Sequence, residues 1–201
     1  MKNIILAIAF VCLIFSLNYG NKAKPGDMQA LDCNNYFLRF KEYYASGKKD
    51  SALIYINKAI DCDGSKNNYK NTKLNFLIST GSYKDAINYL DKTSFLDRTS
   101  LNIIKGVLNL KINNIEESNK ELKEAFEEYK KIEKPSTNEL FYFIALINYF
   151  ENSDEALNKL NQVEKEFSPE TYEGQIFSAL KKNILENKKD VVLFNLFNIK
   201  D

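Results

Sequence analysis

Residues 81–93 read GSYKDAINYLDKT, and the same order of polar turn, small residue and spaced apolar residues occurs five times along the chain. The other four copies begin at Gly47, Asn113, Glu151 and Asn187. The small or short residue after each turn, here called the anchor, recurs at intervals of 34, 32, 38 and 36 residues, at Ala52, Ala86, Ser118, Ala156 and Val192. Repeats of this length are typical of solenoid proteins.

Each anchor starts a helical pattern. The residues four and seven positions after it, which share one face of a helix, are mostly apolar. They are Ile56, Leu90, Leu122, Leu160 and Leu196 at the first position, and Ala59, Thr93, Ala125, Val163 and Ile199 at the second. A second apolar-periodic stretch precedes each turn, over residues 36–44, 74–78, 101–110, 140–150 and 176–184. Each unit is therefore predicted to be helix, short turn and helix.

A single hairpin of this kind cannot bury its apolar stripe alone, so stacked neighbours must supply the rest of the core. We therefore predict an all-α protein, an α–α superhelix (solenoid) of about five antiparallel helical hairpins. Pro25, Pro135 and Pro169 agree with this prediction, because none falls inside a periodic stretch, where proline would break a helix. An irregular helical bundle is the alternative.

The second unit carries a recognisable motif. Gly81–Ala86 resembles the tetratricopeptide repeat (TPR) family, in which Gly-x-Tyr-x-x-Ala opens the second helix of a pair and a later Ala closes it. Residues 47–52 with Ala59 nearly match as well. The other units depart from the motif, since the family's Trp is absent, Asn113 and Asn187 replace Gly, and Ser118 and Val192 replace Ala. The resemblance covers about residues 33–199 and implies a protein–protein interaction module without chemistry of its own.

The resemblance also implies where a partner would bind. In this family the first helix of each pair lines a concave groove that holds extended or helical peptides. Carrying these positions over gives the predicted partner-binding residues Phe37, Lys41, Tyr44, Asn71, Asn75, Ile78 and Asn148, with Ile103, Val107, Lys111, Phe141 and Ala145 as further groove positions. Asn71 and Asn75 are able to bond a peptide backbone, whereas the basic clamp of some members is absent. A second interpretation, as residues of the core, applies to Phe37, Ile103, Val107 and Phe141.

The N-terminus has the composition of a secretory signal peptide. Lys2 precedes an apolar run over residues 4–17, and the small residue Gly20 follows. The run is shorter than the roughly 20 residues that a membrane-spanning helix needs. We predict a signal peptide over residues 1–20, cleaved after Gly20 or else after Ala23, although an uncleaved anchor is an alternative. A linker over residues 21–32 and a TPR-like repeat domain over residues 33–201 are expected to follow.

Cys12 is the cysteine that could carry a lipid anchor if the chain were a bacterial lipoprotein. The lipid-accepting Cys of a bacterial lipoprotein follows a small residue, but Phe10 and Val11 precede Cys12, which lies inside the apolar run. These neighbours argue against lipidation. We therefore expect a periplasmic or secreted protein whose mature chain does not insert into a membrane.

Removal of the leader leaves two cysteines, Cys33 and Cys62. They lie 14 to 15 residues on either side of the first turn, at Gly47 and Lys48. Because a helix rises 1.5 Å per residue, both arms of the hairpin climb about 22 Å and bring the cysteines to the same end. In an oxidising compartment this arrangement predicts a Cys33–Cys62 disulfide. Two free thiols are the alternative.

Composition argues against most chemistry. The chain has no histidine, which removes the commonest general base and nearly all imidazole-containing zinc sites, and two cysteines cannot form a Cys₄ site. No glycine-rich phosphate loop occurs among the seven glycines. We predict no catalytic residue, no metal ligand and no cofactor; a hydrolase based on carboxylates such as Glu127 and Glu128 is the remaining enzyme alternative. Without Lys2 the chain has 27 basic and 27 acidic residues, which argues against nucleic acid as a partner.

The last predicted helix, residues 191–199, is apolar on more than one face. A terminal repeat usually presents a polar cap. This pattern predicts that the C-terminus docks onto a partner or self-associates through Phe194 and Phe197. Together these features favour an exported adaptor or scaffold of the bacterial cell envelope that binds a protein or peptide. The alternative is an inhibitor or immunity-type protein that binds one toxin or enzyme.

Overall fold

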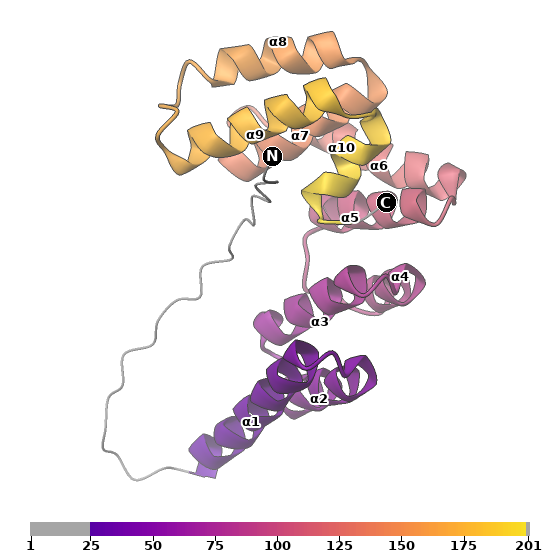
Figure 1. Cartoon of the computed structure of the whole chain (residues 1–201), viewed down its shortest axis with the longest axis vertical. Coiled ribbons are helices and arrows are strands. Elements are labelled where there is room, and N and C mark those ends of the chain that lie inside the picture. Colours follow the sequence, from indigo (N-terminus) through magenta and orange to yellow (C-terminus); the bar gives the residue numbers. More distant parts are fainter. Residues whose placement is uncertain (1–24, 200–201) are drawn as a thin grey trace, which may run out of the picture.

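The computed structural model describes residues 25–199, and its side chains from Asp32 onward. This part of the chain contains ten helices and no strand (Figure 1). The helices are α1 (Pro25–Ala45), α2 (Lys49–Cys62), α3 (Asn67–Ser79), α4 (Tyr83–Asp91), α5 (Arg98–Lys111), α6 (Ile115–Tyr129), α7 (Thr137–Phe150), α8 (Ser153–Val163), α9 (Tyr172–Glu186) and α10 (Lys189–Leu196). Consecutive pairs form five hairpins, so the predicted all-α solenoid is confirmed.

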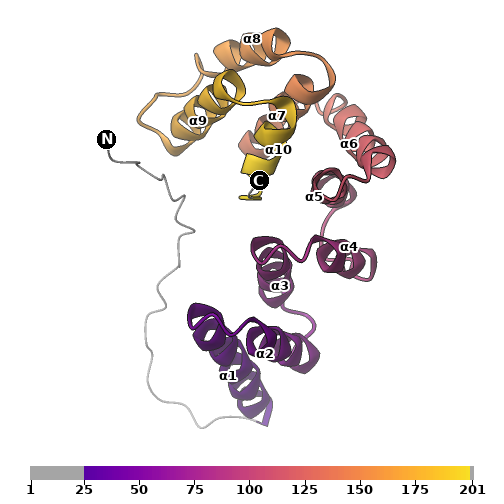
Figure 2. The same cartoon turned by 45° about the vertical axis from the view of Figure 1, so that its right-hand side comes forward.

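The hairpins stack into an arc. Figure 2 shows α2, α4, α6 and α8 along the outer side of this arc, and the first helix of each pair along the inner side. Each of the first four outer helices packs on its own partner and on the first helix of the next unit. The inner side is therefore the concave surface of the solenoid.

The first three hairpins share one turn geometry. Each turn has three residues, and its middle residue adopts a left-handed conformation, with φ of 73°, 79° and 62° at Gly47, Gly81 and Asn113. The following amide donates to the carbonyl five residues earlier at 2.9 Å, from Lys48 to Tyr43, Ser82 to Leu77 and Asn114 to Asn109. Glycine and asparagine are the residues that adopt this helix-ending conformation most readily. Asn113 therefore adopts the same left-handed conformation that Gly47 and Gly81 adopt in the first two turns.

The last two hairpins turn differently. Only two residues separate α7 from α8 and α9 from α10. Glu151 and Asn187 have φ of −100° and −128°, which need no glycine. Asn187, which stands where the family motif has Gly, therefore does not adopt the left-handed conformation that Asn113 adopts. Its side chain instead donates to the carbonyl and side-chain oxygens of Asn183, at 3.1 and 2.9 Å.

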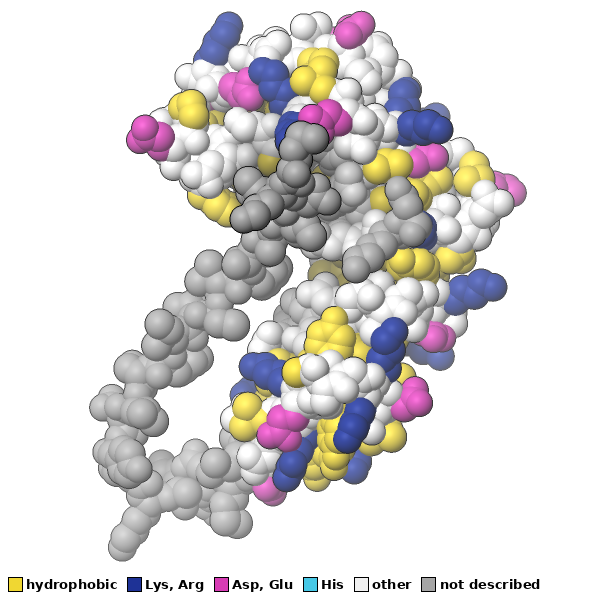
Figure 3. All heavy atoms as spheres, in the orientation of Figure 1, with side chains coloured by type: hydrophobic (Ala, Val, Ile, Leu, Met, Phe, Trp, Pro, Cys, Tyr) yellow, Lys and Arg dark blue, Asp and Glu magenta, His cyan; other side chains and the backbone are white. Residues whose placement is uncertain are grey.

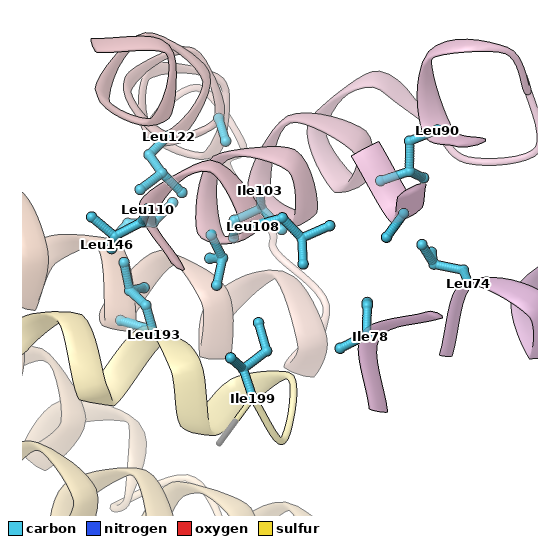
Figure 4. Close-up of a cluster of buried hydrophobic side chains, with 14 of the residues drawn as sticks. Leu74, Ile78, Leu90, Ile103, Leu108, Leu110, Leu122, Leu146, Leu193 and Ile199 are labelled. Atoms are coloured by element: carbon cyan, nitrogen blue, oxygen red, sulfur yellow. The ribbon is translucent and has the colours of Figure 1, made fainter. Parts of the chain in front are cut away.

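The anchors form the centre of the core. All five are fully buried, and so is the residue four positions later in each of the first four units. Leu196, the corresponding residue of the fifth unit, is only half-buried. Figure 4 shows part of the core, with Leu193 and Ile199 of the C-terminal segment pointing toward Leu108 and Leu146.

Leu196 is less buried because α10 does not stack in line with the other outer helices. It packs on α9, but also on α7 and α5, which belong to the fourth and third units. Figure 2 shows α10 on the inner side of the arc. The fifth hairpin thus folds its second helix back into the concave surface.

The first hairpin is closed by a disulfide between Cys33 and Cys62, whose Cα atoms are 5.4 Å apart. Helix α1 begins at Pro25, a favoured residue for the first turn of a helix. Residues 25–32, which the sequence placed in a linker, are therefore helical. The predicted signal peptide, its two cleavage positions and Cys12 lie outside the described residues. Between residues 25 and 199, no helix combines the length and the apolar character needed to cross a membrane.

Candidate partner-binding surface

A pocket of about 220 Å³ lies on the concave surface between α1 and α3. We call it the α1–α3 groove, and its lining residues are Phe40, Tyr44, Thr72, Asn75, Phe76 and Ser79. The first helices of the first two hairpins form its walls. The groove is therefore built from the elements in which the sequence predicted partner binding.

Three aromatic rings form the floor of the groove. The Phe40 and Tyr44 rings stack with their centroids 5.8 Å apart, and the Phe76 ring meets both edge-on, at 5.7 and 5.4 Å. Edge-to-face and offset pairs of this kind are favourable beyond the area they bury. The Tyr44 hydroxyl is hydrogen-bonded to Ser79 Oγ at 3.0 Å, which fixes the ring at the rim. The floor is thus apolar and held in place, whereas its edge is polar.

Four of the seven predicted partner-binding residues are exposed at or beside the groove. Tyr44 and Asn75 line it directly. Asn71 lies one helical turn before Asn75, and both side chains are exposed. Lys41 is also exposed, and its ammonium group lies 4.7 Å from the centre of the Phe37 ring. Tyr44 and Asn75 thus place a hydroxyl and an amide group in the groove itself, whereas Asn71 and Lys41 lie about one helical turn from these lining residues.

The other three predicted residues are buried. Phe37 and Ile78 are 7% and 6% exposed, and Phe37 packs on the Tyr69 ring at 4.8 Å. Asn148 is 1% exposed, and its side-chain oxygen accepts a hydrogen bond from Ser153 Oγ at 2.9 Å. Asn148 therefore holds the turn between α7 and α8 together. Phe37 thus belongs to the core, the second interpretation that the sequence left open. Ile78 and Asn148 are buried as well, which the sequence did not indicate.

Sequence reasoning missed Phe40, Thr72, Phe76 and Ser79. The family positions selected three residues per helix and left out their neighbours. A signal was present, because Phe37, Phe40 and Tyr44 are spaced three and four residues apart and thus lie along one face of α1. This aromatic stripe runs from the core into the groove.

The concave surface of the third and fourth units is covered by α10. The further groove positions Ile103, Val107 and Ala145 are buried. Lys111 Nζ lies 4.8 Å from the centre of the Phe194 ring, and the ring of Tyr142 stacks on that of Phe197 at 6.0 Å. The predicted self-association residues Phe194 and Phe197 are thus half-buried against their own chain.

A buried polar network joins the second unit to the third. Lys105 Nζ of α5 lies 2.8 Å from Asp91 Oδ1 of α4 and 2.8 Å from Glu121 Oε1 of α6. Glu121 is 5% exposed and also accepts a hydrogen bond from Asn109 Nδ2 at 3.0 Å. Burial alone would lower the pKa of Lys105, but the hydrogen bonds and charges of Asp91 and Glu121 raise it above its ordinary value. We call this set the Lys105 joint.

The remaining charged surface is mixed in sign. Both acidic and basic side chains occur along the length of the face in Figure 3. A depression of about 390 Å³ on α5 and α6 is lined mainly by charged residues, including Arg98 and Glu124, which pair at 3.3 Å. Glu127 and Glu128 bind separate lysines, Lys130 at 3.5 Å and Lys131 at 2.7 Å. Among the described residues, no cluster of three or more acidic, cysteine or histidine side chains is arranged to hold a metal ion.

No protein-family model matches the chain, and comparison with curated proteins finds no match. Among solved structures the chain is similar to YrrB, described as a TPR protein with an unusual peptide-binding site, at 18% identity and a TM-score of 0.43. That match covers 86% of this chain and 91% of YrrB. The chain is also similar to MamA, at 15% identity and a TM-score of 0.45, over 81% of this chain and 92% of MamA.

Proposed function

We propose that this chain is an exported protein–protein interaction module that holds a peptide segment of its partner in the α1–α3 groove, as an adaptor or scaffold of the bacterial cell envelope. One observation carries the proposal. The groove combines a fixed aromatic floor with exposed polar side chains on the open part of the concave surface. Apolar depressions with a few convergent polar groups are the usual form of binding sites.

The chemistry of the groove favours an extended peptide with an apolar side chain. The Tyr44 ring, which is 43% exposed, offers most of the apolar area for one such side chain, and the Phe40 and Phe76 rings beneath it, 3% and 5% exposed, support it. Each of Asn71 and Asn75 offers two donors and one acceptor to a peptide backbone. Lys41 adds a positive charge near the groove, which favours a segment with an acidic residue.

Export is supported by two features of different kind. Residues 1–20 have the composition of a signal peptide, and the Cys33–Cys62 disulfide suits an oxidising compartment. Fractionation of cells followed by mass analysis of the N-terminus tests export directly. A cytoplasmic chain that retains residues 1–20 would contradict this part of the proposal.

In-cell crosslinking tests the groove. A photo-crosslinking residue placed at Lys41 is expected to attach the chain to one envelope protein. In the same background, the double variant Tyr44→Ala/Asn75→Ala is expected to lose this crosslink. Ile54→Ala is the matched control, because Ile54 is 53% exposed on α2, away from the groove. Equal crosslinking by all three chains would contradict binding in the groove.

The same experiment separates the scaffold from the inhibitor. A scaffold is expected to crosslink to a component of a larger envelope complex and to purify with that complex. If the crosslinked protein is instead one soluble enzyme or toxin, its activity can be assayed with and without this chain. Stoichiometric loss of that activity would establish the inhibitor alternative.

A further inference from the structure

Helix α10 lies along α7 in a defined register. At one end, Lys189 Nζ donates to the carbonyl oxygens of Tyr149 and Glu151, both at 3.2 Å. In the middle, Leu193 is fully buried and points toward Leu146 (Figure 4). At the other end, the Phe197 ring stacks on that of Tyr142. From Lys189 to Phe197 the residue numbers of α10 increase, while those of the contacted residues of α7 decrease from Glu151 to Tyr142. The two helices are therefore antiparallel.

The spacing of these contacts defines what the surface accepts. Lys189, Leu193 and Phe197 follow one another at intervals of four residues and therefore share one face of α10. A cation suits the first position, because the last carbonyls of a helix lack intrahelical partners and carry partial negative charge. Leu193 and Phe197 supply an aliphatic and an aromatic anchor. Phe194, under Lys111 of α5, adds a second aromatic contact.

Helix α10 is the shortest of the described helices, with eight residues, of which Val192 and Leu193 are buried. Its N-cap residue, Lys188, makes no side-chain capping hydrogen bond, as is also the case in α2, α4 and α6. Phe194, Leu196 and Phe197 keep part of their surface in solvent. Segments with few buried apolar contacts are those that open locally at low free-energy cost. A helix held in this way is able to exchange with a competitor.

We propose that the concave surface along α5 and α7 is a second binding site, which accepts an amphipathic helix carrying a cation, an aliphatic residue and aromatic residues at the spacing of α10, and that α10 occupies this site until a partner helix displaces it. The site is separate from the α1–α3 groove and does not depend on the function proposed for that groove. While α10 is docked, only the concave surface of the first two units is open. Undocking of α10 extends the binding surface to the third and fourth units.

A synthetic peptide of residues 187–201 with a fluorescent label is the probe, and binding to the full chain is followed by fluorescence anisotropy. In the wild-type chain α10 competes at high effective concentration, so the peptide is expected to bind weakly. Phe197→Ala weakens docking in cis but leaves the receiving surface intact, and its affinity for the peptide is expected to rise at least tenfold. Tyr172→Ala, at a residue 66% exposed on α9, is the control and is expected to bind as the wild-type chain does.

Tyr142→Ala removes the surface that receives Phe197 and is expected to show no such gain. Equal affinity of the wild-type and Phe197→Ala chains, or an equal gain in Tyr142→Ala, would overturn the proposal. Hydrogen–deuterium exchange of the unmodified chain is an independent measurement, in which amides of residues 192–199 are expected to exchange faster than those of residues 176–184. If the amides of residues 192–199 and of residues 176–184 exchanged only when the whole chain unfolds, the proposal would also be overturned. Tyr44→Ala is expected to bind the peptide as the wild-type chain does, so failure of the α1–α3 groove as a site leaves this result unchanged.

Discussion

Gly106 of α5 packs directly against Leu122 of α6. A Cβ at this position would lie 2.6 Å from Leu122 Cγ and 3.1 Å from the Leu122 backbone nitrogen. Leu122 is itself fully buried, so it has no room to move away. Overpacking of a core costs about 1–3 kcal/mol. Alanine gains only about 1 kcal/mol over glycine in helix propensity.

We therefore expect Gly106→Ala to lower the free energy of unfolding by about 1 kcal/mol, measured by urea denaturation. Gly64→Ala is the control, because the nearest atom to a Cβ there is the Ile60 carbonyl oxygen at an ordinary 3.5 Å. This control is expected to unfold at the urea concentration of the wild-type chain. A Gly106→Ala chain more stable than the wild type would show that α6 shifts freely.

At the scale of an element, the turns divide the hairpins into two groups, the first three and the last two. Asn113 has a φ of 62° and Asn187 a φ of −128°. Asn113→Gly is expected to raise the free energy of unfolding by a few tenths of a kcal/mol, because glycine adopts the left-handed conformation without the steric cost of a Cβ. Asn187→Gly is expected to lower it, because it removes two hydrogen bonds to Asn183 and adds backbone freedom. Paired urea titrations measure both, and effects of the same sign would contradict the assignment of two turn types.

The same two residues show how far the sequence predicts the fold. The anchors and the apolar residues after them are local signals with helical spacing, and they locate all five hairpins. The direction of α10 is not local, because Asn113 and Asn187 are the same residue type in similar polar turns. The length of the turn does not set this direction either, because the fourth hairpin also has a two-residue turn and its α8 lies on the outer side of the arc (Figure 2). What distinguishes α10 is the apolar surface of α5 and α7 that receives it. The groove is intermediate, since groove positions carried over from the family resemblance included the exposed Lys41 and Tyr44, whereas the burial of Phe37 and Ile78 depends on neighbouring helices.

The disulfide is expected to stabilise the first hairpin. Cys33 and Cys62 are separated by 29 residues, and in the chain-entropy model closure of such a loop contributes about 3–4 kcal/mol. Reduction is therefore expected to lower the free energy of unfolding of the mature chain by about this amount, measured in urea with and without reductant. A Cys33→Ser/Cys62→Ser chain is the control and is expected not to respond to reductant. An intact mass that does not increase by about 2 Da on reduction would contradict the bridge.

At the scale of the whole molecule, the Lys105 joint determines how the first two units are held to the rest. Asp91 ends α4, and only residues 92–97 connect it to α5. Lys105 places its positive charge between Asp91 and the buried Glu121. A joint at this point fixes the α1–α3 groove relative to the concave surface that α10 covers. Its loss is expected to affect both stability and the geometry of the arc.

Lys105→Met removes the charge but keeps much of the apolar stem. It leaves Glu121 buried beside Asn109 without its counter-charge, and breaking a buried pair in this way costs about 3–5 kcal/mol. We expect a loss toward the lower end of this range, about 3 kcal/mol, because Lys105 keeps 20% of its side chain exposed. Lys131→Met is the matched control, because Lys131 and its partner Glu128 are both largely exposed, and no measurable change is expected.

The pH dependence of this difference tests its electrostatic origin. The pKa of Lys105 is raised in the folded chain, so its stabilisation is fully present below the ordinary lysine pKa of about 10.4 and is lost as the pH rises through the folded value. The wild-type and Lys105→Met chains should therefore differ in free energy of unfolding at pH 8 and converge above about pH 10.4. Tyrosine ionisation also destabilises the chain in this range, since burial raises the pKa of Tyr89 to about 12, but it acts on both chains equally. A difference that stays constant from pH 8 to pH 11 would show that Lys105 contributes through packing of its stem and not through its charge.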